Sequence, residues 1–159
     1  SGSGVRSLEG VGLMAVKYGQ LVEFTKKIEK LNEKQKEDFL ESCCKELAAR
    51  LLRKVIKRTP VGVYEHKKGG TLRRGWTAAR NGAQGSDDIY IRKNGDSYIV
   101  DITNAVEYAI YVEYGHRTRD HKKWVPGKYM LTVSEKELQT TAPQILERKI
   151  KKFLEDAIQ

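Results

Sequence analysis

Apolar and polar positions alternate with helical periodicity through the first third of the chain. Over residues 20–31 apolar residues recur every three or four positions, at Leu21, Phe24, Ile28 and Leu31. This spacing predicts a short amphipathic helix. Asn32 and Gln35 have the spacing of a capping box, so a longer second helix is predicted to begin there.

The second helix is predicted to bury one stripe of side chains and to end at a proline. At about 100° per residue, one face collects Leu40, Cys43, Cys44, Leu47, Leu51 and Val55. The opposite face carries Glu46, Arg50, Arg53 and Lys57, which we expect in solvent. Thr59-Pro60 ends the helix, because a residue before proline is disfavoured in the α region.

The middle of the chain has the alternation of β-strands. Residues 61–71 are predicted as a glycine-rich loop, and residues 72–79 as a strand with Trp76 as its core anchor. Residues 89–92 and 98–102 alternate around Asn94-Gly95, which predicts a β-hairpin.

Residues 105–159 give a less regular pattern. Residues 105–114 fit either a strand or a short helix, and Gly115 begins a charged loop. Residues 129–133 alternate as a final strand, and Ser134 with Glu137 resembles a helix cap. A C-terminal helix is predicted to start near Pro143, with a buried stripe of Leu146, Ile150, Phe153 and Ala157.

These elements predict an α+β fold: an antiparallel sheet of about four strands, packed by a long N-terminal helix and a C-terminal helix. Residues 1–13 are interpreted as an added or disordered tag before Met14, and residues 14–159 as a single domain. No apolar run approaches the roughly 20 residues of a membrane span, so we expect a protein of the cytoplasm with no membrane partner.

The net charge of +9 is concentrated in residues 50–80. The ten basic residues of this segment are Arg50, Arg53, Lys54, Lys57, Arg58, Lys67, Lys68, Arg73, Arg74 and Arg80, and its one acid is Glu65. Such a local positive field attracts a polyanion, most simply the phosphates of nucleic acid. The residues expected to face DNA, without base readout, are Arg53, Lys57, Lys67, Lys68, Arg73 and Arg74. A solvated helix face is the alternative interpretation.

Few residues suggest catalysis, and no catalytic residue, metal or cofactor is expected. The adjacent Cys43 and Cys44 are interpreted as reduced core residues. His116, Asp120 and His121 lie close in sequence and could form a metal-dependent nuclease site, but their spacing matches no known metal motif.

Aromatic residues gather near one predicted loop: Tyr108, Tyr111, Tyr114, Trp124 and Tyr129. They fit either packing at the core edge or a subunit interface, where tyrosine and tryptophan are favoured.

Three sequence blocks resemble a known family. The first block (residues 58–75) contains Arg58-Thr59-Pro60-Val61, Gly70, Leu72, Arg73 and Gly75. The second block (residues 104–115) contains Asn104-Ala105, Tyr108-Ala109, Tyr111-Val112-Glu113 and Gly115. A weaker third has Pro126 and Tyr129-Met130-Leu131. Together they resemble the small neck proteins of tailed bacteriophages, the tail-completion or head–tail joining proteins related to minor tail protein Z of lambdoid phages. A longer basic loop at residues 62–69 is similar to the branch from Gram-positive phages or contractile-tail prophages.

The resemblance implies a structural virion protein, not an enzyme. It would form a ring, expected to be hexameric, between the portal-side connector and the tail tube or terminator, with DNA passing through. Assembly would take place in the cytoplasm of the bacterial host. The motif positions implied as fold or assembly determinants are Pro60, Gly70, Leu72, Gly75, Tyr108, Tyr111, Glu113 and Gly115. The alternatives are a tail terminator that caps the tube and, in a different class, a nonspecific nucleic-acid-binding regulator.

Overall fold

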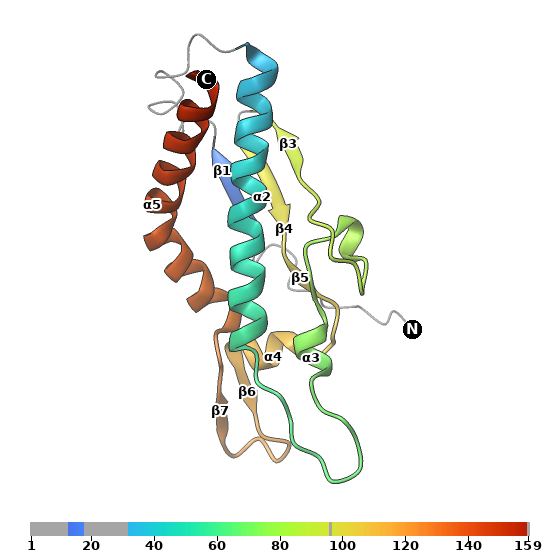
Figure 1. Ribbon diagram of the computed structural model, residues 1–159. Coiled ribbons are helices and arrows are strands. Elements are labelled where there is room, and N and C mark those ends of the chain that lie inside the picture. The colour runs from blue at the N-terminus through green and yellow to red at the C-terminus, as the bar shows by residue number, and fades with distance from the viewer. Residues whose placement is uncertain (1–12, 18–31, 96, 159) are drawn as a thin grey trace.

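The computed structural model describes residues 13–17, 32–95 and 97–158. Two long helices lie side by side, and the first of them also packs on the strands (Figure 1). These are α2 (Glu33–Arg58) and α5 (Met130–Ile158). The α+β class predicted from the sequence is confirmed, with a long N-terminal and a C-terminal helix.

The remaining elements are short. In chain order they are β1 (Leu13–Lys17), α3 (Thr71–Arg74), β2 (Trp76–Thr77), the 3-10 helix η2 (Arg80–Gly82), β3 (Arg92–Asn94), β4 (Ser97–Asp101), β5 (Thr103–Asn104), α4 (Ala109–Tyr114), β6 (Gly115–Arg117) and β7 (Trp124–Pro126). The described strands pair antiparallel in three small sheets, ordered β1-β4-β3, β2-β5 and β6-β7. The predicted sheet is therefore divided into short ladders.

Helix α2 follows its sequence signals closely. The Asn32 side chain accepts a 2.8 Å hydrogen bond from the Gln35 backbone N–H, and the Gln35 side chain accepts a 3.2 Å bond from the Asn32 N–H. The helix ends at Arg58, with Thr59 as its C-cap. The predicted apolar stripe, from Leu40 to Val55, is buried.

The predicted hairpin forms between β3 and β4, in a shorter version than expected. Its register pairs Arg92 with Ile99 and Asn94 with Ser97. The other edge of β4 pairs with β1, from Leu13 opposite Asp101 to Lys17 opposite Ser97. This strand was not predicted, and it includes Leu13, the last residue of the segment interpreted as a tag. The short helix predicted over residues 20–31 lies outside the described residues.

Two predictions in the middle of the chain need correction, and one open alternative is decided. Residues 72–79 do not form one strand: α3 occupies Thr71–Arg74, and β2 begins at Trp76. Residues 105–114, which fitted either a strand or a short helix, contain the helix α4. The segment after Gly115, predicted as a charged loop, is the β6–β7 hairpin. The physical reason for the first is Gly70, whose φ of 94° turns the chain sharply before α3.

The predictions for residues 129–144 were wrong. Residues 129–133 are not a strand, because α5 starts at Met130. Ser134 is inside the helix, where its hydroxyl donates a 2.6 Å hydrogen bond to the Met130 carbonyl instead of capping a new turn. Pro143 is also in the helix interior. A proline there costs about 3 kcal/mol, which the packing of α5 on α2 must offset.

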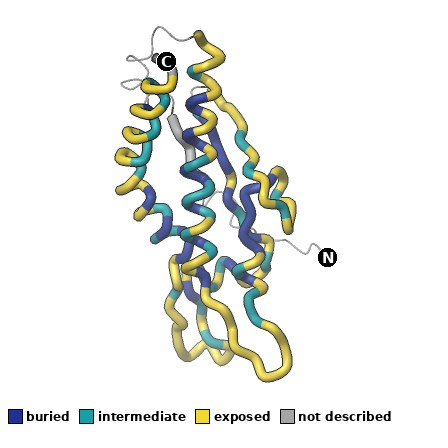
Figure 2. The backbone as a smooth tube through the Cα atoms, in the orientation of Figure 1, coloured by how far each residue is buried: buried dark blue, intermediate teal, exposed yellow. Residues whose placement is uncertain are grey.

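The main core lies between α2, the strands and the start of α5 (Figure 2). Its fully buried large side chains include Leu40, Leu51, Val55, Val100, Ile102, Met130 and Leu131. Trp76 is also buried, as predicted. A smaller cluster of Phe39, Cys43 and Ile150 joins the far ends of α2 and α5, where the rings of Phe39 and Phe153 stack at 4.5 Å.

Candidate functional site

The two main sequence blocks meet at one buried amide. The Asn104 side chain has no exposed surface; its Nδ2 donates a 2.8 Å hydrogen bond to the Leu72 carbonyl, and its Oδ1 accepts a 3.0 Å bond from the Val106 N–H. Gly75 lies directly against this amide, so that a Cβ at Gly75 would collide with Oδ1. The glycine of the first block and the asparagine of the second are therefore required by the same close approach.

Glu113 of the second block caps α5. Its carboxylate is fully buried and accepts hydrogen bonds from the N–H groups of Leu131 (3.0 Å) and Thr132 (2.9 Å), and from the Thr132 hydroxyl (2.7 Å). These N–H groups belong to the first turn of the helix, where no intrahelical acceptor exists and negative charge is favoured. Glu113 is thus a structural residue whose acceptor capacity is used within the fold.

The chain crosses itself closely next to this cap. Gly115 has a φ of 90°, and a Cβ there would meet the backbone of Val125 and Gly127. The N–H of Lys128 donates a 2.7 Å bond to the Val112 carbonyl, and the N–H of Tyr129 a 3.0 Å bond to the Glu113 carbonyl. The end of α4 is therefore fixed to the segment that leads into α5.

Thr59 organises the first block at the end of α2. Its hydroxyl donates a 2.6 Å hydrogen bond to the Val55 carbonyl and accepts a 2.7 Å bond from the indole N–H of Trp76. Its carbonyl accepts two bonds from the Arg73 guanidinium, at 2.7 and 3.1 Å. Arg73, one of the residues expected to face DNA, is therefore occupied in holding α3 against the C-terminus of α2.

A groove of about 270 Å³ runs between the loop at residues 61–70 and α4. Four motif positions line it, namely Pro60, Gly70, Leu72 and Tyr108, together with Lys67 and Lys68. Residues of both sequence blocks therefore line the same groove. The remaining motif residue with an exposed side chain, Tyr111, lies on α4.

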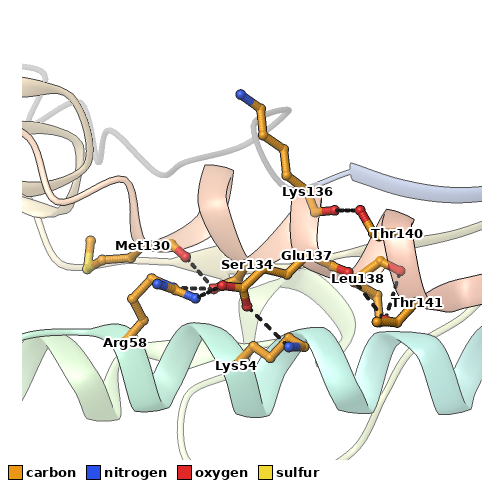
Figure 3. A network of polar contacts seen from close by, with 9 residues as sticks. All are labelled: Lys54, Arg58, Met130, Ser134, Lys136, Glu137, Leu138, Thr140 and Thr141. Atoms are coloured by element: carbon orange, nitrogen blue, oxygen red, sulfur yellow. Dashed lines mark hydrogen bonds and ion pairs between the residues drawn. The ribbon is translucent and has the colours of Figure 1, made fainter.

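Two basic residues of α2, Lys54 and Arg58, pair with one carboxylate of α5. Glu137 accepts a 3.2 Å hydrogen bond from Lys54 and a second from Arg58, whose Nε also donates to the Ser134 hydroxyl at 3.2 Å (Figure 3). The bonds from Arg58 and then Lys54 hold the pKa of Glu137 below its ordinary value.

A second ion pair joins the same helices. Lys149 donates a 2.7 Å hydrogen bond to Glu46, which also accepts a 3.2 Å bond from Arg50. The bond from Lys149 is the largest cause of the lowered pKa of Glu46, and burial opposes it. We call this contact between the two helices the α2–α5 seam; its two carboxylates, Glu46 and Glu137, are paired with four cations.

The other residues expected to face DNA divide into two groups. Arg53, Lys57 and Lys68 are exposed, and within the described part of the chain no hydrogen bond or ion pair engages their side chains. Arg74 donates a 3.1 Å bond to the Gly69 carbonyl, and the Lys67 ammonium lies 4.5 Å from the centre of the Tyr64 ring. Their DNA contacts stay a prediction.

The aromatic residues singled out in the sequence are exposed. Those between 40% and 60% exposed are Tyr108, Tyr111, Tyr114, Trp124 and Tyr129. The rings of Tyr114 and Tyr129 meet edge to face at 6.4 Å, and Tyr111 meets His116 at 6.1 Å. These half-exposed side chains are compatible with both interpretations open at the sequence level, packing at the core edge and a subunit interface. They form an exposed aromatic face over α4 and β7.

The histidines and cysteines occupy separate environments. Asp120 accepts hydrogen bonds from the Thr118 hydroxyl (2.5 Å) and the Lys122 N–H (3.1 Å), and the bond from Thr118 is the main cause of its lowered pKa. Over residues 13–17, 32–95 and 97–158, no three acidic, histidine or cysteine side chains are grouped as a metal site. Burial raises the pKa of Cys43 to about 12 and that of Cys44 to about 11.

Residues 22–115 match the model of one protein family, described as "Bacteriophage HK97-gp10, putative tail-component". The match covers more than half of the chain. The chain belongs to the HK97-gp10-like family. Comparison with curated proteins and with solved structures finds no further match. None of the described helices of this gp10-like chain has the length and apolar character needed to cross a membrane.

The family assignment agrees with the coarse part of the sequence interpretation, a structural component of a bacteriophage tail and so of the virion. The matched range of the gp10-like chain contains both main sequence blocks and ends at Gly115. Neither Asn104 nor Thr59 was among the predicted site residues, although both are buried polar groups that organise the blocks. The signal that could have found Asn104 is its place at the start of the second block.

Proposed function

We propose that this chain is a structural subunit of the phage neck, related to minor tail protein Z, that completes the tail at the head side. Copies of the chain form a ring, as a hexamer, between the portal-side connector and the tail tube or terminator, and DNA passes through it. The subunit assembles in the host cytoplasm and catalyses no reaction. The longer basic loop at residues 62–69 supports assignment to the Gram-positive phage or contractile-tail prophage branch.

The observation that carries this proposal is that the second block contains both buried polar residues and exposed aromatic residues. Its polar members, Asn104 and Glu113, are fully buried and bonded to backbone groups, so they maintain the fold. Its exposed members, Tyr108, Tyr111 and Tyr114, present aromatic rings to the surroundings. Tyrosines with an apolar body and a polar tip are enriched at protein interfaces. This division supports a subunit that acts by assembly.

Electron microscopy of particles made without the gene tests the proposal. Full heads beside separate, finished tails are the expected result, with joining restored when the gene is supplied in trans. Tails of uncontrolled length would instead assign the chain as a tail terminator. Normal, infectious particles would overturn a structural role and favour the nucleic-acid-binding regulator.

Ring formation is tested on particles and on the purified chain. Sedimentation velocity should detect self-association at high concentration or in the presence of the neighbouring neck protein. A matched set of variants separates interface from fold: Tyr111→Ser and Tyr108→Ser remove exposed rings, whereas Tyr90→Ser removes an exposed ring outside α4 and β7. Loss of association in the first two variants alone supports the aromatic face as the contact.

A further inference from the structure

Two basic loops from distant parts of the sequence project from the same end of the molecule (Figure 1). One is residues 61–70, between α2 and α3, and the other is residues 117–128, the outer part of the β6–β7 hairpin and its exit. Helix α4 links them, because it lines the groove beneath the first loop through Tyr108 and Val112 and continues directly into β6. We call these two loops the basic tip.

The basic tip carries seven cationic side chains, all exposed: Lys67, Lys68, Arg117, Arg119, Lys122, Lys123 and Lys128. Its acids are Glu65 and Asp120, and the Asp120 carboxylate is occupied by Thr118 and by the Lys122 N–H. Among the described residues, none of the seven cations is in an ion pair with a carboxylate. The tip therefore has more cations than acids, and Figure 2 shows that both loops are largely exposed.

Hydrogen bonds within the hairpin order the backbone of its lysines. The Thr118 N–H donates a 2.9 Å hydrogen bond to the Lys123 carbonyl, and the Lys123 N–H donates a 3.1 Å bond back to the Thr118 hydroxyl. The His121 N–H donates a 2.8 Å bond to the Thr118 carbonyl. Lys122 and Lys123 thus extend from a closed turn with their backbone already ordered, which lowers the entropic cost of binding.

The positive field was predicted at residues 50–80, which include the C-terminal part of α2, and the structure shows how these cations differ from those of the tip. Of the basic residues on that helix, Arg50, Lys54 and Arg58 are each bonded to a carboxylate of α2 or α5. The residues after position 80 are neutral when averaged together, so the overall charge count pointed to residues 50–80, although the hairpin itself was predicted as a charged loop. Folding therefore pairs three cations of α2 with two carboxylates, whereas the cations of the hairpin stay exposed and have no ion pair among the described residues.

We infer that the basic tip binds the phosphate backbone of duplex DNA without selecting a base sequence. Exposed lysines and arginines on two loops match a polyanion, and binding that neutralises phosphates releases their counterions. The biological setting of this contact, DNA passing through a neck ring, rests on the proposed function. The binding itself is a property of the purified chain and can be tested separately.

The experiment is a fluorescence anisotropy titration of the full chain against a labelled duplex of about 20 base pairs and arbitrary sequence, repeated over a series of KCl concentrations. The tip variant is K67Q/K68Q/K122Q/K123Q. The control variant, K136Q/R148Q/K151Q/K152Q, removes the same charge from exposed positions of α5. Circular dichroism and thermal unfolding confirm that both variants fold.

We expect the tip variant to bind DNA at least about tenfold more weakly than wild type, and its salt slope to fall by roughly 0.9 for each phosphate that it no longer neutralises. The control variant should change affinity by less than about threefold. Equal weakening in the two variants would mean that net charge alone drives binding, and would overturn the proposal. So would the failure of the wild-type chain to bind DNA at low salt, an outcome that leaves the neck assignment and its deletion phenotype untouched.

Discussion

The side-chain amide of Asn104 bonds to the backbone carbonyl of Leu72, 2.8 Å away, and so joins two sequence blocks that are separated by the whole β3–β4 hairpin. The same amide accepts the Val106 N–H and lies against Gly75. A buried amide that satisfies two backbone groups is costly to replace, because neither group can reach water once its partner is removed.

Replacing Asn104 should therefore destabilise the protein without leaving a large cavity. We expect Asn104→Ala to lower the free energy of unfolding by about 2–4 kcal/mol, since the Leu72 carbonyl and the Val106 N–H would both be left without a partner. Urea denaturation measures this change. The exposed Gln139→Ala is the control, expected within about 0.5 kcal/mol of wild type. An Asn104→Ala protein as stable as this control would contradict the bridging role.

Glu113 gives a second prediction, which concerns the start of α5. Glu113→Ala removes the acceptor of two first-turn N–H groups and should cost about 2–4 kcal/mol. Glu113→Gln keeps one acceptor oxygen but removes the charge that suits a helix N-terminus, so it should destabilise the protein less. The measurement is again urea denaturation, with the exposed Glu107→Gln as the matched control. Equal stability of all three variants would show that the cap is dispensable.

Part of the fold was predictable because its signals are local. The capping box at Asn32 and the stop at Thr59-Pro60 lie within α2 or next to it, and both predictions are confirmed. The start of α5 was not predicted, because its capping carboxylate, Glu113, comes from α4. β1 was missed for a similar reason: its ordering depends on pairing with β4, far away in sequence.

In the candidate site, too, contacts between residues far apart in the sequence could not be predicted. The blocks identified the residues that matter, but not that Asn104 and Glu113 act from the interior. The charge pattern identified Arg73 and Arg58, yet it could not foresee that Thr59 and Glu137 occupy them. Conversely, the basic stretch at residues 117–123 was predicted only as a charged loop, because acids elsewhere after residue 80 balance it in the overall count. The fold then places it at the same end of the molecule as the loop at residues 61–70.

The α2–α5 seam should weaken in acid. The folded-state pKa values of Glu46 and Glu137 lie below the ordinary value of 4.5, so their stabilising effect is complete above that value and disappears as pH falls through the folded-state values. The double variant Glu46→Gln with Glu137→Gln should be less stable than wild type at neutral pH, and the difference should shrink as the pH falls below 4.5 through the folded-state pKa values. Urea midpoints across this range measure it, with Glu147→Gln as a control. A difference that persists unchanged in acid would mean that the ion pairs are not its cause.

The two cysteines should resist alkylation while the protein is folded. Both thiols are buried, and burial raises their pKa values to about 12 and about 11, so almost no thiolate exists near neutral pH. Iodoacetamide should label Cys43 and Cys44 only after urea unfolds the chain, as mass spectrometry would show. Glutathione treated in parallel confirms that the reagent is active. Rapid labelling of the native protein would contradict the burial of this helix face.

The two tryptophans form an internal comparison between a core and a surface aromatic. Trp76 is 5% exposed and bonded to Thr59, whereas Trp124 is 60% exposed. Trp76→Ala should lower the free energy of unfolding by about 3–5 kcal/mol, because it leaves a cavity and an unpaired Thr59 hydroxyl. Trp76→Phe isolates the hydrogen bond and should cost about 1 kcal/mol beyond the effect of the smaller ring. Trp124→Ala should stay within about 0.5 kcal/mol of wild type. The reverse order, with Trp124 the more costly to remove, would be inconsistent with a core built around the end of α2.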